Sequence, residues 1–185
     1  ALLYTAERFP HAFAIYYNNI AEGYMTQAKD ADAVHYFKKA IDFNNLKEAD
    51  EDKNYLFFGI YRGMATAYIK LDQFDDALAS LQNLEKLPKE EDPLPAWTLA
   101  TWGFYYQHTG DFKKSLVYHE KSLEGYGAYS SQRSSGYWNI GQIAIDQKEY
   151  TRALEYFQKS LIINVPAFKS TAILDNPKYD EIIDK

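Results

Sequence analysis

What the sequence lacks narrows its function before any pattern is considered. Cysteine is absent, so the chain forms no disulfide bonds and has no thiolate chemistry. No apolar run approaches the roughly 18 residues that a membrane-spanning helix needs. The net charge is −6, which would repel a nucleic-acid backbone, and the lysines are scattered rather than gathered into a stripe. We therefore expect neither nucleic acid nor a membrane as a direct partner.

No motif brings together the residues that catalysis or cofactor binding would need. The histidines form no HExxH motif and no pair four residues apart that could hold a metal. His119 falls on a packing position and is expected to be a core residue with satisfied hydrogen bonds. The serine-rich stretch 125–137 contains a lone G-x-G without a preceding strand, which indicates an inter-repeat linker rather than a phosphate loop. We expect no enzymatic activity, no cofactor and no metal.

Aromatic residues, in contrast, are unusually frequent: they make up 17% of the chain, with 17 Tyr and 11 Phe. Such side chains must be packed or used in recognition. Their spacing indicates an internal repeat, because Phe74, Phe112 and Tyr150 open similar segments at intervals of 38 residues (112 − 74 and 150 − 112). A fourth copy precedes these at an interval of 44 residues, and the polar stretch 44–54 accounts for the excess as a longer loop.

Each copy divides into two helix-length pieces. In the last copy Tyr137, Ile140 and Gly141 fall on one face of a helix, and after a short turn Ala153 and Phe157 fall on one face of a second helix. This pattern predicts an antiparallel helical hairpin. A glycine costs about 1 kcal/mol in a helix interior relative to alanine. We therefore expect Gly141 at a point where a Cβ would obstruct the partner helix.

The arrangement of large and small residues resembles the tetratricopeptide repeat family, whose pattern W-x₂-L-G-x₂-Y is followed by A-x₃-F and a later proline. The 38-residue period is longer than the family's usual 34, Ser115 replaces the alanine and His119 replaces the aromatic residue. The resemblance covers roughly residues 14–166 and implies an all-α fold, an α-α superhelix or solenoid of about four helical hairpins with a C-terminal capping helix. The matching residues of the last copy are Tyr137, Ile140, Gly141, Ala153 and Phe157.

The predicted organisation is a single repeat domain over residues 1–185. Residues 1–13 are expected to be part of a preceding helix. Residues 167–185 are expected to form the C-terminal cap, with Asn176 as N-cap and Pro177 at the first helical position. Such a cap covers the last hairpin of a solenoid. The repeats are expected at approximately 14–46, 55–90, 94–128 and 132–166.

The resemblance also implies a peptide-binding groove, because the first helices of stacked hairpins line a concave surface. Trp138 and Phe104 would supply large contact area at little cost in rotamer entropy, and the alternative is that they pack against a neighbouring hairpin. The family's clamp for C-terminal carboxylates is disfavoured, since no register supplies its lysines and arginine. The expected groove residues are Asn18, Glu22, Met25, Arg62, Thr66, Ile69, Trp97, Phe104, His108, Trp138 and Gln142.

These observations predict a non-catalytic scaffold that binds a protein or peptide segment in the groove. The alternative is a ligand-sensing regulatory domain of a larger transcription regulator or sensor kinase. The lack of cysteine favours the cytoplasm and also permits a periplasm. Neither the identity of the partner nor the oligomeric state follows from the sequence.

Overall fold

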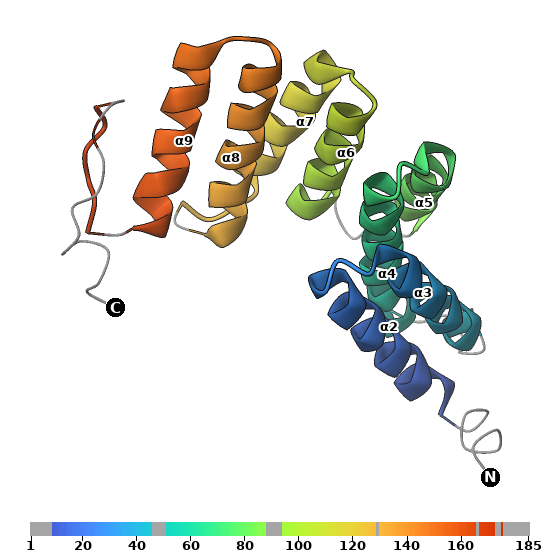
Figure 1. Ribbon diagram of the computed structural model, residues 1–185. Coiled ribbons are helices and arrows are strands. Elements are labelled where there is room, and N and C mark those ends of the chain that lie inside the picture. The colour runs from blue at the N-terminus through green and yellow to red at the C-terminus, as the bar shows by residue number, and fades with distance from the viewer. Residues whose placement is uncertain are drawn as a thin grey trace. The chain divides into compact units, whose positions relative to one another are not determined.

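A computed structural model describes residues 9–45, 51–87, 94–128, 130–165, 167–172 and 175. These residues form eight α-helices and no β-strand (Figure 1). The predicted all-α fold is therefore confirmed. In chain order the helices are α2 (Pro10–Thr26), α3 (Asp30–Asn45), α4 (Glu51–Lys70), α5 (Phe74–Lys86), α6 (Ala96–His108), α7 (Phe112–Glu124), α8 (Ser131–Asp146) and α9 (Tyr150–Asn164).

Consecutive helices pack as the four hairpins α2–α3, α4–α5, α6–α7 and α8–α9 (Figure 1). The chain divides into two compact units, residues 1–94 and residues 95–185, and each unit contains two hairpins. In the first unit α4 also packs against α3 and α2, and in the second unit α8 also packs against α7 and α6. The single repeat domain stays a prediction.

The repeat register coincides with the helix boundaries. The second helices α5, α7 and α9 begin at Phe74, Phe112 and Tyr150, the three aromatic residues from which the 38-residue period was derived. Helix α3 begins at Asp30, which precedes Phe74 by the expected 44 residues. Helix α2 begins at Pro10, earlier than expected, because proline at the first helical position is already fixed in a helical φ.

The turn inside each hairpin has the same backbone geometry. In three of the turns the residue after the left-handed one donates its N–H to a carbonyl five residues back, as from Lys29 to Tyr24 at 3.0 Å. These bonds close the first helix and reverse the chain. The left-handed residues, which recur at the repeat intervals, are Ala28 (φ 56°), Asp72 (φ 56°), Gly110 (φ 83°) and Lys148 (φ 62°).

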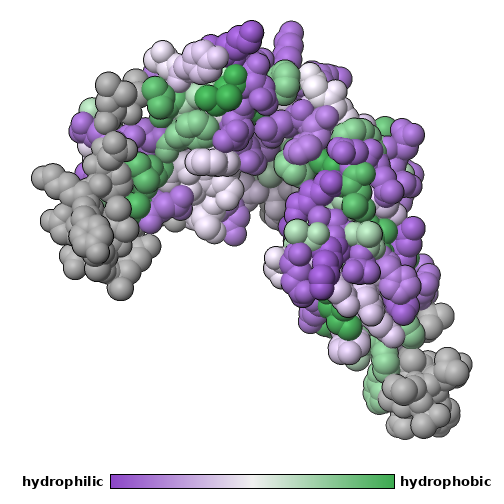
Figure 2. Space-filling model, viewed as in Figure 1, coloured by the Kyte–Doolittle hydropathy of each residue, from purple (hydrophilic) through white to green (hydrophobic). Residues whose placement is uncertain are grey.

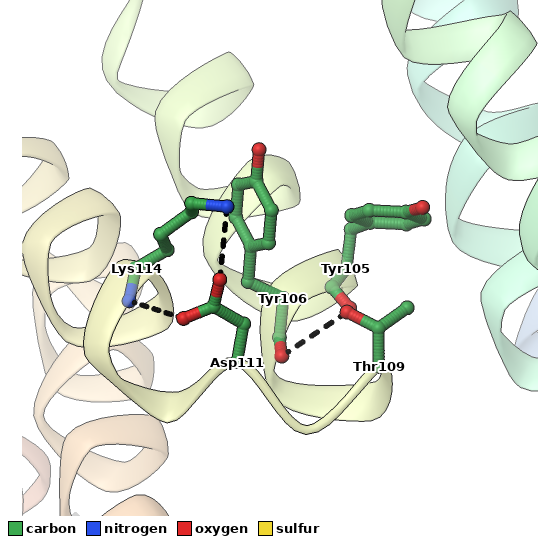
Figure 3. Close-up of polar contacts among 5 residues, drawn as sticks. All are labelled: Tyr105, Tyr106, Thr109, Asp111 and Lys114. Atoms are coloured by element: carbon green, nitrogen blue, oxygen red, sulfur yellow. Dashed lines mark hydrogen bonds and ion pairs between the residues drawn. The ribbon is translucent and has the colours of Figure 1, made fainter.

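Side chains hold the turn between α6 and α7 (Figure 3). Asp111 caps α7, because its carboxylate accepts a hydrogen bond from the backbone N–H of Lys114 at 3.1 Å and pairs with Lys114 Nζ at 2.9 Å. These two contacts lower the pKa of the Asp111 carboxyl below its usual value. On the other side of the turn Thr109 Oγ1 donates to the carbonyl of Tyr105 at 3.0 Å.

The serine-rich stretch 125–137 is a linker only in part. Helix α8 begins within it, at Ser131, because Ser130 is an N-cap whose side chain accepts a hydrogen bond from the backbone N–H of Arg133 at 3.2 Å. The expectation that the whole stretch is a linker is therefore wrong, since residues 131–137 are helical.

Several glycines within the helices stand where a neighbouring helix leaves no room for a Cβ. A Cβ added to Gly141 would lie 2.5 Å from Cε1 of Phe157 in α9, and one added to Gly103 would lie 2.8 Å from Cε1 of His119 in α7. The prediction for Gly141 is thus confirmed, and the obstructing group is the partner helix's aromatic ring. Gly63 of α4 stands in the same relation to Phe37, which belongs to the preceding hairpin.

His119 of α7 is fully buried against Gly103 of α6, with 0% of its surface exposed. Neither ring nitrogen has a hydrogen-bond partner, so the expectation of a satisfied core histidine is wrong in that respect. Burial lowers the pKa of His119 to about 4 from its usual 6.5. The core of this hairpin therefore holds a neutral imidazole at neutral pH.

The segment after α9 lies against that helix. Phe168 is buried, and Gln158 of α9 donates a hydrogen bond from Nε2 to the carbonyl of Ser170 at 3.0 Å. Covering of the last hairpin by Phe168 agrees with the expected C-terminal cap. The final helix expected at Asn176 and Pro177 lies outside the described residues. Of the preceding helix expected in residues 1–13, residues 1–8 also lie outside the described residues, whereas residues 10–13 belong to α2.

Candidate functional site

The predicted groove residues of the second unit lie on α6 and α8, which contact each other. The two helices share one register, in which each α8 residue corresponds to the α6 residue 38 positions earlier. Trp138 then corresponds to Ala100, and Gln142 corresponds to Phe104. Equivalent residues on neighbouring, equivalently oriented helices share a face, so Trp138, Gln142 and Phe104 belong to one surface of this unit.

Trp138 is the most exposed aromatic residue among these, with 51% of its surface accessible. Its ring packs on Phe157 of α9, with ring centroids 4.8 Å apart and planes at 44°. Phe157 in turn packs against Gly141. One face of the Trp138 indole is therefore in contact with a ring that is itself packed against α8. Trp138 therefore combines a packed face with an accessible face, which is the arrangement of an aromatic anchor.

Phe104 and His108 form a second aromatic pair on α6. Their ring centroids lie 4.2 Å apart at 62°, and His108 Nδ1 lies 3.0 Å from the carbonyl oxygen of Phe104. Phe104 is half-buried and His108 is exposed. Trp97, in contrast, stands in the first turn of α6 and is half-buried. Of the predicted groove residues on α6 and α8, His108 alone carries an ionisable side chain.

The groove residues predicted in the first unit are only partly accessible. Ile69 is fully buried, because α4 is covered by α2, α3 and α5, so the expectation that Ile69 lines a groove is wrong. Asn18 is also buried, at 8% exposed, and its Nδ2 donates to Glu22 Oε1 at 3.5 Å. Glu22 is exposed and Met25 is half-buried.

Arg62 and Thr66 of α4 are both half-buried. Thr66 Oγ1 donates a hydrogen bond to the carbonyl of Arg62 at 3.0 Å, so this hydroxyl is engaged by its own helix. The predicted groove residues of the first unit that keep accessible surface are thus Glu22, Met25, Arg62 and Thr66.

In the described ranges no group of three His, Cys, Asp or Glu side chains is suited to a metal ion. None of the helices described is both long and apolar enough to cross a bilayer. A cleft of about 160 Å³ lies beside α9, away from the predicted groove, and is lined by Glu155, Gln158, Lys159, Ile162 and Thr171.

The face seen in Figure 2 is mostly hydrophilic, with hydrophobic side chains in separate groups rather than in one continuous patch. Several large apolar side chains are nevertheless exposed. In α2 these include Ile15 and Tyr16, at 40% and 59% exposed, which sequence patterns did not single out. The repeat alignment could have revealed Tyr16, because it places this residue 44 positions before Ile60, which is fully buried in α4.

Comparisons with known proteins agree with the repeat. Residues 94–164 match the family model of the tetratricopeptide repeat. No curated protein matches the chain. Among 13 matching chains of solved structures is one from the functional characterization of pilF of Pseudomonas aeruginosa, with a TM-score of 0.62 and 16% identity. The match covers 84% of this chain and 63% of that chain, and at this identity it shows the fold alone.

Proposed function

Because this chain carries tetratricopeptide repeats, we propose that it is a non-catalytic scaffold that binds a protein or peptide segment on the surface of its first helices. Repeats of this family generally mediate protein–protein interactions. In the second unit we assign the contact to Trp138, Gln142, Phe104 and His108. The protein thus acts by holding a partner, without a cofactor.

The observation that carries the proposal is the half-exposed indole of Trp138. Exposing an aromatic ring to water costs free energy that burial against a partner would recover, at about 25 cal/mol per Å² of apolar surface. The ring is held by Phe157 before any partner arrives, so little rotamer entropy is lost on binding. The amide of Gln142, one helical turn away, offers both a donor and an acceptor for a peptide backbone.

The test is selection of peptides from a displayed random library on the folded chain, followed by affinity measurement with the enriched peptides. Trp138→Ala should weaken binding by about tenfold or more, the effect of truncating an aromatic anchor. Tyr150→Ala is the matched control, because Tyr150 is an aromatic residue of similar exposure, 60% against 51%, but lies on α9. Equal weakening by both variants, or none by either, would refute the assignment.

The alternative, a ligand-sensing domain of a larger regulator, stays a prediction. Its test is different, since it requires a DNA-binding or kinase segment in the complete gene product. The cytoplasm likewise stays our proposed compartment, and fractionation of the native cells would check it.

A further inference from the structure

The first helices of the second unit share an accessible face with heptad spacing. On α8 its residues follow one another at intervals of four, three, four and three, and on α6 at intervals of three, four and three. At about 100° per residue, each set falls within an arc of about 80°. All of these residues are exposed or half-buried. The residues of this heptad face are Ser131, Ser135, Trp138, Gln142 and Ile145 on α8 and Trp97, Ala100, Phe104 and Gln107 on α6.

The heptad face carries no charged side chain. Helix α6 contains no Asp, Glu, Lys or Arg. Helix α8 contains Arg133 and Asp146, but Arg133 points about 140° away from Trp138 and Asp146 points about 100° away from Ile145. Most charges of these four helices lie on the second ones, which contain Lys113, Lys114, Glu120, Lys121 and Glu124 in α7 and Arg152, Glu155 and Lys159 in α9.

An uncharged face selects an uncharged partner. A charged side chain buried against Trp138 or Phe104 would lose its hydration without gaining an opposite charge, and this weakens binding strongly. The equivalents of Gln142 and Trp138 in the first unit are Glu22 and Arg62, so this property belongs to the second unit. The hydroxyl of Ser135 makes no demand on a partner, because it already donates to the carbonyl of Ser131 at 3.0 Å.

The spacing of the apolar anchors favours a helical partner. Trp138 and Ile145, which are 51% and 39% exposed, lie seven residues apart and hence about 10.5 Å apart along α8. A partner helix repeats this distance, because its own residues seven apart share a face at the same separation. Side chains on one face of an extended strand recur at about 6.8 Å and about 13.6 Å, so a strand alongside α8 would miss one of the two anchors.

We propose that the partner segment held on the heptad face is an amphipathic helix whose contacting side is apolar and uncharged, with side chains seven residues apart beside Trp138 and Ile145. The inference rests on the proposed binding function and adds the chemistry and the conformation of the bound segment. Ala100 and Ser135 are small and leave room for the backbone of such a helix. The amide of Gln142 can still donate to that backbone, since a helical carbonyl keeps a second lone pair.

The test extends the peptide selection to a library about 20 residues long, which is enough for a helix as long as α8. Among the enriched peptides whose binding Trp138→Ala weakens, we expect apolar residues at intervals of three and four, and no charged residue at those positions. Circular dichroism should show that each such peptide gains helix on mixing with the full chain. Raising sodium chloride from about 50 mM to about 500 mM should change the affinity by less than about twofold, because no ion pair forms.

Ile145→Ala tests the second anchor, and Leu154→Ala is its matched control. The two side chains have similar exposure, 39% and 43%, but Leu154 lies on α9. We expect Ile145→Ala to weaken binding of these peptides at least about fivefold, and Leu154→Ala to weaken it by less than about twofold. Equal effects of the two variants would overturn the proposal.

The outcomes separate this inference from the function on which it rests. If no peptide is enriched, or if Trp138→Ala leaves all binding unchanged, the proposed function fails and this inference fails with it. If Trp138-dependent peptides are enriched but alternate apolar and polar residues, carry charges at the contacting positions or gain no helix, the binding function stands and the uncharged helical partner is refuted.

Discussion

Acidification should weaken the second unit through one residue, His119. The imidazole is fully buried and neutral, and its pKa is lowered to about 4 from 6.5. Between these two values the unfolded chain binds a proton that the folded chain does not. The free energy of unfolding therefore falls as the pH drops from 6.5 to 4, and is independent of this group outside that window. The full loss is about 3 kcal/mol, of which about 2 kcal/mol falls between pH 7 and pH 5.

His119→Phe isolates this contribution. Phe37, Leu81 and Phe157 occupy the equivalent position in the other hairpins, and Gly103 leaves room for a ring, so phenylalanine should fit. All other titrating groups are shared, so the stability difference between the variant and the native chain should widen by about 2 kcal/mol from pH 7 to pH 5.

Urea unfolding followed by tryptophan fluorescence is the suitable assay, because all three tryptophans lie in the second unit, as His119 does. A change of about 2 kcal/mol moves the urea midpoint by on the order of 1 M. If the midpoints of the native chain and of His119→Phe shift in parallel between pH 7 and pH 5, the imidazole is protonated in the folded state and the reasoning is refuted.

Two further predictions concern the backbone. Gly141→Ala should destabilise the second unit by about 1–3 kcal/mol through the clash with Phe157, whereas Gly59→Ala, where nothing lies within 4 Å, should stabilise the chain by up to about 1 kcal/mol. Thermal unfolding of both variants checks this, and a shift of the same sign in both would contradict it. Lys148→Gly should stabilise by about 1 kcal/mol because its φ is 62°, and Gly110→Ala at φ 83° should destabilise by a similar amount. If calorimetry shows that Lys148→Gly and Gly110→Ala change the stability in the same direction, the backbone strain assigned to the left-handed positions is disproved.

The sequence predicted the hairpins because their determinants are local and periodic. Phe112 and Tyr150 mark helix starts at a fixed interval, and Gly141 in a helix interior indicates a close approach whatever the partner. The caps at Asp111 and Ser130 carry recognisable side chains, yet the linker expected over residues 125–137 overlaps the first turns of α8. Serine is common in linkers as well as at N-caps, so composition alone does not separate the two.

The candidate surface was harder to predict, because accessibility depends on which helices surround a residue. Ile69 was assigned to a groove from its position in the repeat, but three neighbouring helices cover α4. Trp138 was assigned by the same reasoning and is half-exposed, as is its equivalent in α4, the half-buried Arg62. The missing hydrogen bonds of His119 also depend on its neighbours in α6, which its own segment does not reveal.

The shared reversal inside each hairpin has a consequence for how this chain can change. The left-handed residue at the tip of each turn is an alanine, an aspartate, a glycine or a lysine, and all four adopt the same backbone conformation. This conformation is therefore dictated by the paired helices and not by the type of residue at the tip. Each tip is therefore a position where charge can be added, removed or inverted at a small energetic cost while the architecture persists.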